Sequence, residues 1–416
     1  MMVAMISLII ILIIYLSYIV LGLPESLLGS AWPSMYSGLN VPLHYAGYVS
    51  MIICAGTVIA TFFSDKITRR FGTSVVVTVS VIMTASSLYG FSFSSSYLLI
   101  CFCAVPLGLG AGSLDAALNN YVALHYKARH MNWLHCFWGI GASIGPIIMS
   151  YYLIKNNSWN MGYRTIGIFQ TCLIVVLFAS LSLWRKNKPS IVSCNEVSRA
   201  SEENKNARHP AGASAKGFTF VELFRTAGVR YVLAAFFFYC GVELTTGLWG
   251  SSYLVIEKNI PAEMAAQWIS LYYFGITLGR FISGFLTIKF SNRQMIRFGQ
   301  GLVACGIVSL MLPFDVLLLP GLFTIGLGCA PIFPSLIHET PKNFGSEKSQ
   351  AIVGIQMASA YIGNLLIPPF FGQLASFTEF KFSLGFKLLP FFLGIVLVLM
   401  IIMIEILFRK VDRSRH

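Results

Sequence analysis

The sequence predicts an all-α membrane protein whose twelve transmembrane helices form two pseudo-symmetric six-helix bundles. Its composition supports this fold class, because 56% of the residues are hydrophobic and only 11% are charged, whereas soluble domains carry about 25% charged residues. Apolar runs long enough to cross about 30 Å of hydrocarbon recur along almost the whole chain. Backbone amides in lipid must find partners within each segment, and the alternating pattern of a membrane barrel is absent, so these runs predict helices.

The apolar runs divide into twelve segments separated by mostly short loops. The first run lacks the basic start and small-residue cleavage site of a signal peptide, so we interpret it as a retained helix. The predicted helices cover residues 6–36, 46–64, 74–92, 97–121, 132–154, 163–184, 229–256, 266–288, 295–312, 317–338, 350–375 and 383–408.

The net charge of +13 is concentrated on one side of the predicted membrane protein. The loops after helices 2, 4, 6, 8 and 10, with the adjoining helix ends and the C-terminal tail, hold 23 of the 29 Lys and Arg residues. The positive-inside rule therefore places these loops and both termini in the cytoplasm, in a multi-pass protein of the cytoplasmic (plasma) membrane. This distribution is a topology signal and argues against nucleic-acid binding.

The cysteines and the sequence motifs give no sign of an enzyme. Eight of the nine cysteines fall inside apolar segments and only Cys194 lies in a loop, which argues against a disulfide framework or a zinc site. We find no convincing nucleophile motif, phosphate-binding glycine loop or metal-ligand spacing. We therefore expect no catalytic residues, no cofactor and no metal.

A polar stretch rich in Ser, Asn, Lys, Arg and Glu separates the first six segments from the last six. We expect it to be a flexible cytoplasmic linker at 185–228, between an N-terminal bundle at 1–184 and a C-terminal bundle with a short tail at 229–416.

The two halves resemble each other at an offset of 218 residues. Glu25 corresponds to Glu243, and the Gly-Leu-Gly run at 108–110 corresponds to the run at 326–328. Two six-helix halves joined by a basic loop predict a transporter with its substrate site between the halves, near the bilayer midplane.

The loop after the second predicted helix carries a recognisable motif, in which Gly56 is followed by the run Ser64-Asp65-Lys66-Ile67-Thr68-Arg69-Arg70-Phe71-Gly72. With this loop, the whole chain resembles the major facilitator superfamily, in which the loop steadies the outward-open state through ion pairs and helix-end contacts. The resemblance implies a role in conformational gating, which we assign to Gly56, Asp65, Lys66, Arg69, Arg70 and the membrane-embedded Arg280.

Three acids lie clearly within predicted helices: Glu25, Asp115 and Glu243. Charged groups at this depth are costly and mark functional sites, and desolvation favours the protonated form of a carboxyl group. We therefore expect these acids to couple transport to protons. Permanent pairing with a buried cation such as Arg280, or sodium binding, stays open. Pro24 loosens the helix beside Glu25, and we expect the freed backbone groups to face a cavity.

The fourth predicted helix narrows the resemblance. The glycine run from Gly108, followed by Asp115, Asn119, Arg129 and Asn132, resembles the fucose-proton symporter family. That branch includes sugar symporters driven by protons or by sodium. The resemblance implies a sugar as substrate.

A sugar site needs planar polar groups that bind hydroxyls and aromatic faces that cover the apolar side of the ring. The polar candidates are Asn119, Asn120, His135, Gln356 and Asn364. The aromatic candidates are Trp32, Trp138, Tyr239, Trp249, Tyr273 and Tyr361.

The sequence therefore predicts a monomeric secondary transporter that moves a small polar solute, best a sugar, by proton symport with alternating access. Its expected partners are the solute, the proton and the lipid bilayer. Three alternatives stay open: a proton-coupled exporter of drugs or metabolites, a sodium-coupled sugar symporter, and a non-transporting sensor or scaffold on the same fold.

Overall fold

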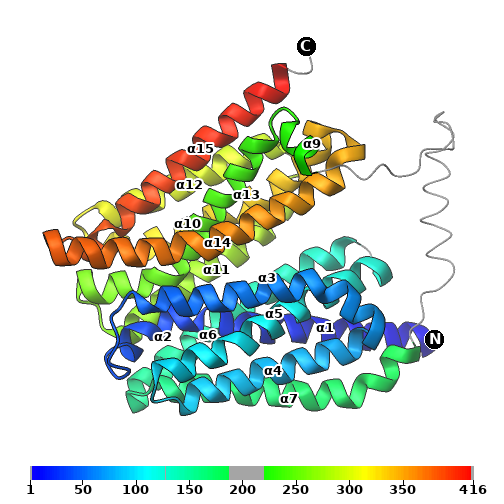
Figure 1. Cartoon of the computed structure of the whole chain (residues 1–416), viewed down its shortest axis with the longest axis horizontal. Helices are drawn as coiled ribbons and strands as arrows, with labels where there is room; N and C mark the ends of the chain where they lie inside the picture. The colour runs from blue at the N-terminus through cyan, green and yellow to red at the C-terminus, as the bar shows by residue number, and fades with distance from the viewer. Residues whose placement is uncertain (1, 127, 187–219, 414–416) are drawn as a thin grey trace.

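The computed structural model describes residues 2–126, 128–186 and 220–413. Within these residues, twelve helical spans are long and apolar enough to cross a membrane. Figure 1 shows that they form two bundles. Six of the spans precede residue 187 and six follow residue 228, which confirms the predicted fold class. The chain is a multi-pass integral membrane protein.

The first bundle contains seven helices because its first span is divided in two. Its helices are α1 (Met2–Glu25), α2 (Leu27–Met35), α3 (Tyr45–Phe71), α4 (Thr73–Phe93), α5 (Tyr97–His125), α6 (Ala128–Asn156) and α7 (Trp159–Lys186).

The second bundle also contains six spans. Its helices are α10 (Val229–Lys258), α11 (Ala262–Leu286), α12 (Asn292–Met311), α13 (Leu318–Phe344), α14 (Ser346–Phe382) and α15 (Leu389–Arg413), with the 3-10 turns η1 (Asp315–Leu317) and η2 (Gly385–Leu388). The short helix α9 (Phe220–Arg225) lies inside the predicted linker. Residues 187–219 of that linker lie outside the described residues.

The break between α1 and α2 follows from Pro24, which has no N–H to donate to the carbonyl of Val20. The side chain of Gln170, from α7, donates to this carbonyl at 3.5 Å and accepts from the Thr84 hydroxyl at 2.7 Å. The freed Val20 carbonyl is therefore satisfied by a buried glutamine.

The glycines of the internal repeat make corresponding contacts in the two bundles. A Cβ atom on Gly108 would lie 2.1 Å from the carbonyl oxygen of Ile53 in α3, and one on Gly326 would lie 2.0 Å from that of Tyr272 in α11. In both bundles, the fourth span can approach the second this closely only because a side chain is absent there.

The bundles meet most closely away from the chain termini. In Figure 1, α1 begins and α15 ends on the same side of the molecule; we call this side the terminal end and the other side the opposite end. Toward the opposite end, a Cβ on Gly29 of α2 would lie 2.2 Å from the carbonyl oxygen of Gly247 in α10. A Cβ on Gly47 of α3 would lie 2.8 Å from Cα of Pro369 in α14.

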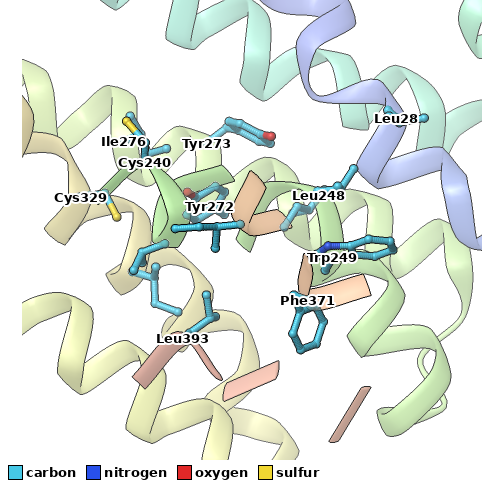
Figure 2. Close-up of a cluster of buried hydrophobic side chains, with 14 of the residues drawn as sticks. Leu28, Cys240, Leu248, Trp249, Tyr272, Tyr273, Ile276, Cys329, Phe371 and Leu393 are labelled. Atoms are coloured by element: carbon cyan, nitrogen blue, oxygen red, sulfur yellow. The ribbon is translucent and has the colours of Figure 1, made fainter. Parts of the chain in front are cut away.

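The buried apolar side chains show the same asymmetry. One large cluster fills the second bundle and extends into the first bundle through residues such as Leu28 and Trp32. Figure 2 shows Leu28 of the first bundle beside Leu248, near Trp249 and Phe371. A separate cluster, built from residues such as Ile14 and Leu177, fills the terminal end of the first bundle alone. Among the described residues, the core shared by the two bundles therefore lies toward the opposite end.

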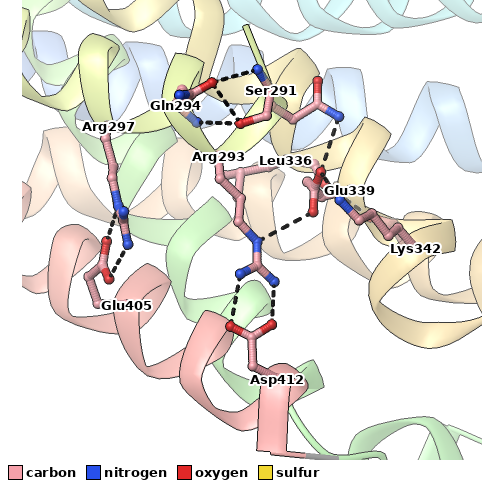
Figure 3. A network of polar contacts seen from close by, with 11 residues as sticks. Ser291, Arg293, Gln294, Arg297, Leu336, Glu339, Lys342, Glu405 and Asp412 are labelled. Carbon is pink, nitrogen blue, oxygen red and sulfur yellow. Dashed lines mark hydrogen bonds and ion pairs between the residues drawn. The ribbon is translucent and has the colours of Figure 1, made fainter. Parts of the chain in front are cut away.

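Ion pairs tie the second bundle together at the terminal end (Figure 3). Arg293 of α12 makes two hydrogen bonds of 2.8 and 2.9 Å to Asp412 of α15 and lies 3.7 Å from the buried Glu339 of α13. Arg297 makes a similar two-point contact with Glu405. Between described residues, every ion pair joins partners of the same bundle.

Candidate functional site

A cavity of about 370 Å³ lies between the two bundles. Residues of all seven helices of the first bundle line it, and residues of α10, α11, α13 and α14 line it from the second. Its volume falls within the range of small-molecule sites, about 300–1,000 Å³.

The three predicted acids all line this cavity, although they are far apart in the sequence. Glu25 is the last residue of α1, at the break caused by Pro24, and its side chain is exposed to the cavity. Glu243, its counterpart in the repeat, reaches the cavity from α10, and Asp115 reaches it from α5.

Two of these acids are joined by a continuous series of contacts across the interface. The indole N–H of Trp138 donates a hydrogen bond to Oε2 of Glu25. The Arg280 guanidinium lies 4.9 Å from the centre of a Trp138 ring, and its Nη2 lies 3.7 Å from Oε1 of Glu243. Glu25 and Trp138 belong to the first bundle and the other two to the second, so we call these four residues the cross-bundle chain.

Asp115 has only uncharged hydrogen-bond donors around its carboxyl group among the described residues. The Tyr18 hydroxyl donates to its Oδ1 at 3.1 Å, and the Asn119 amide donates to the same oxygen at 3.0 Å. Both bonds end on the same oxygen of the carboxyl group.

Five of the predicted substrate ligands line the cavity: His135 and Trp138 from α6, Tyr273 from α11, and Tyr361 and Asn364 from α14. The structure therefore brings together polar and aromatic groups from both bundles.

The other three polar candidates do not line the cavity. Asn119 instead holds Asp115, and its own Oδ1 is buried without a partner. Asn120 is exposed on another face of α5. Gln356 is completely buried, and its amide makes hydrogen bonds with the Thr340 hydroxyl.

Three aromatic candidates are buried structural residues. Trp32 donates its indole N–H to the Leu43 carbonyl at 2.6 Å, and Trp249 donates to the Pro368 carbonyl at 2.8 Å. Tyr239 donates its hydroxyl to a backbone carbonyl of α13 at 3.0 Å. Buried N–H and O–H groups need partners, and these backbone bonds hold all three side chains away from the cavity.

Several lining residues were missed by the sequence analysis. Tyr18 lies seven residues before Glu25, two turns away on the same face of α1, so helical spacing could have identified it. Phe91 and Tyr163 reach the cavity from α4 and α7, and nothing in their spacing relates them to the acids.

The predicted gating residues occupy different places. Gly56 packs against the backbone of α5 within the first bundle. Asp65 pairs at 3.0 Å with Arg69 on its own helix, and both are exposed, as are Lys66 and Arg70. Arg280, expected within a membrane helix, lines the cavity as part of the cross-bundle chain.

No group of three or more His, Cys, Asp or Glu side chains placed to hold a metal ion occurs in the described part of the chain.

The fold and the cavity define a membrane protein of two six-helix bundles around a central cavity. The family model of the Major Facilitator Superfamily matches residues 14–266 and 231–416, so the chain belongs to this superfamily.

Two similar proteins and one solved structure illustrate the relationship. The chain is 24% identical over 287 residues to Bypass of stop codon protein 6 of Saccharomyces cerevisiae, a match that covers 67% of this chain but only 56% of the yeast protein. It is 22% identical over 327 residues to the glucose/mannose transporter GlcP of Bacillus subtilis, with 77% of each chain covered. The crystal structure of the D-xylose-proton symporter aligns with a TM-score of 0.73 at 14% identity, over 95% of this chain and 97% of that chain.

Proposed function

We propose that this protein is a secondary transporter that carries a small polar solute together with protons, and that this solute is a sugar. The observation that carries the proposal is the meeting of Glu25, Asp115 and Glu243 in one cavity between the bundles. Carboxyl groups at membrane depth are energetically costly, so their presence indicates a function, and proton transfer is a common one.

The chemistry of the cavity supports a sugar. The Asn364 amide and the His135 ring can bind hydroxyl groups, while Tyr273 and Tyr361 offer aromatic faces to the apolar side of a sugar ring. The likeness to a glucose/mannose transporter points to the same class of solute. The motif around Asp115 supports the narrower assignment to the fucose-proton symporter family.

The acids are assigned different roles by their partners. Glu25 and Asp115 receive hydrogen bonds from uncharged donors, so neither has an ion-pair partner among the described residues that would hold it in its charged form. Glu243 lies beside the Arg280 guanidinium, which favours a charged pair and a smaller part in proton transfer.

We assign this conformation to the inward-facing state of an alternating-access cycle. The basic loops and both termini are placed in the cytoplasm by the positive-inside rule, and the shared core lies at the opposite end. The exposed Asp65–Arg69 pair, with Lys66 and Arg70, would make its gating contacts when the terminal end closes. A monomer in the cytoplasmic membrane, with bundles at 1–184 and 229–416 joined by a flexible linker, completes the proposal.

The test is the internal pH of proteoliposomes that contain the full chain, measured with a trapped dye as single sugars are added without an imposed gradient. The panel is D-glucose, D-mannose, D-galactose, D-xylose and sucrose. We expect acidification with a subset of these sugars, its loss in Asp115→Asn, and its retention in Asp315→Asn, which alters an exposed acid outside the cavity.

Two results would redirect the assignment. Uptake that needs sodium, with no pH change, would indicate sodium coupling. No change in internal pH with any sugar, together with proton exchange against apolar cations, would indicate an exporter. The cavity favours the exporter as second candidate, because its three acids face a single lining cation, Arg280, among the described residues.

A further inference from the structure

Both the indole N–H and one ring face of Trp138, the two groups that could contact a ligand, are in contact with other side chains in this structure. Its indole N–H is used by Glu25, and one of its ring faces is covered by the Arg280 guanidinium at 4.9 Å. An aromatic face exposed to a cavity can take a cation or the apolar side of a sugar ring. Arg280 therefore occupies the kind of surface that a sugar would use.

A second contact, with Glu243, is available to the Arg280 guanidinium. Its Nη2 lies 3.7 Å from Glu243 Oε1, well beyond the 2.7–2.9 Å of a charge-assisted hydrogen bond. A small shift away from Trp138 and toward Glu243 would form such bonds. Both residues belong to the second bundle, so this shift would break the contact that joins the two halves of the cross-bundle chain.

We propose that Arg280 caps the face of Trp138 in the empty protein, and that a sugar ring displaces it from this face when it binds. The displaced guanidinium then forms a close ion pair with Glu243. This inference rests on the proposed function and supplies its binding mode. Sugar binding thereby removes a contact between the bundles, close to where Gly139 of α6 meets Thr277 of α11.

The test is the dissociation constant of the purified full-length protein for each sugar of the panel, measured by calorimetric titration without any gradient. The paired substitution Arg280→Gln with Glu243→Gln removes the cap and keeps the charge balanced. The reference is Glu243→Gln alone, in which Arg280 can still cover Trp138 but can form no ion pair with residue 243. Because a cation–π contact contributes about 0.5–2 kcal/mol, the paired variant should bind roughly 2- to 30-fold more tightly than this reference. Arg280→Lys, which keeps a weaker cap, should give a smaller gain, and Trp138→Ala should weaken binding.

The matched control is Arg164→Gln. Arg164 stacks at 4.6 Å over Phe93, outside the cavity, so its loss removes the same kind of contact without touching the site. Each variant is first compared with the unaltered protein by gel filtration and melting temperature.

Each outcome decides between distinct readings. Tighter binding in the paired variant than in Glu243→Gln, with unchanged binding in Arg164→Gln, supports the cap. Equal affinity in the paired variant and in Glu243→Gln overturns the cap and leaves sugar transport standing, while weaker affinity in the paired variant makes Arg280 a direct ligand and also overturns it. Absence of binding by the unaltered protein to every sugar overturns the proposed function and the cap together.

Discussion

Replacing Gly29 by alanine should shift the protein away from the conformation described above. The new Cβ would lie 2.2 Å from the carbonyl oxygen of Gly247 and 3.0 Å from Cα of Leu248, both backbone atoms that no side-chain rotation can move. Ordinary contact begins at 3.4 Å, so the helices must separate by about 1.2 Å at this point. Overpacking of this kind costs about 1–3 kcal/mol.

That cost applies only while α2 and α10 are in contact. In the outward-open state of the proposed cycle the opposite end separates and the methyl group is accommodated. A bias of about 1–3 kcal/mol changes the ratio of the two states by about 5- to 150-fold.

The assay is the distance between spin labels at positions 66 and 289, which lie exposed at the terminal end in different bundles. We expect Gly29→Ala to enrich the short-distance population. The matched control, Gly301→Ala, adds the same methyl group where nothing lies within 4 Å. An unchanged distance distribution in a folded Gly29→Ala protein would refute the argument that this contact holds the opposite end closed.

Three further predictions concern stability, each read from the melting temperature in detergent. Gln170→Leu should lower the melting temperature, because the substitution leaves the buried Val20 carbonyl without a hydrogen-bond donor. The corresponding loss in the free energy of unfolding is about 1–3 kcal/mol. An unchanged melting temperature would show that this carbonyl has another partner. Arg293→Met should lower the melting temperature more than Arg297→Met, because only Arg293 is a partner of the buried Glu339 carboxylate on α13. The exposed pair of Arg297 contributes less than about 1 kcal/mol. Equal decreases in melting temperature would contradict this reasoning. Burial lowers the pKa of His44 in the folded protein, so the unfolded chain binds a proton at this residue at a higher pH than the folded chain does. The melting temperature should therefore fall as the pH drops below about 6.5. The fall should be shallower in His44→Gln, and an identical fall would exclude His44 as the cause.

The fold could be predicted from the sequence because a bilayer imposes one length on every span. The repeat was equally informative, since Glu25 and Glu243 both line the cavity and Gly108 and Gly326 make equivalent contacts. These features depend on spacing along the chain, which the sequence records directly.

The direction in which each aromatic side chain points could not be predicted. Helices that are apolar on all sides give no signal of which face is turned inward, so Trp138, which lines the cavity, could not be separated from Trp32 and Trp249, which bond to backbone carbonyls. The place of Gln170 was equally hidden, because its partner is a carbonyl freed by a proline 146 residues earlier in the chain.

The core shared by the two bundles has a thermal consequence. Opening the opposite end exposes apolar side chains such as Leu28 and Leu248 to water, and exposure of apolar surface raises the heat capacity. The attraction between such side chains weakens on cooling. In the proposed cycle, the balance between the inward-facing and outward-open states therefore depends on temperature with a curved profile, and cooling weakens the contact that holds the opposite end closed.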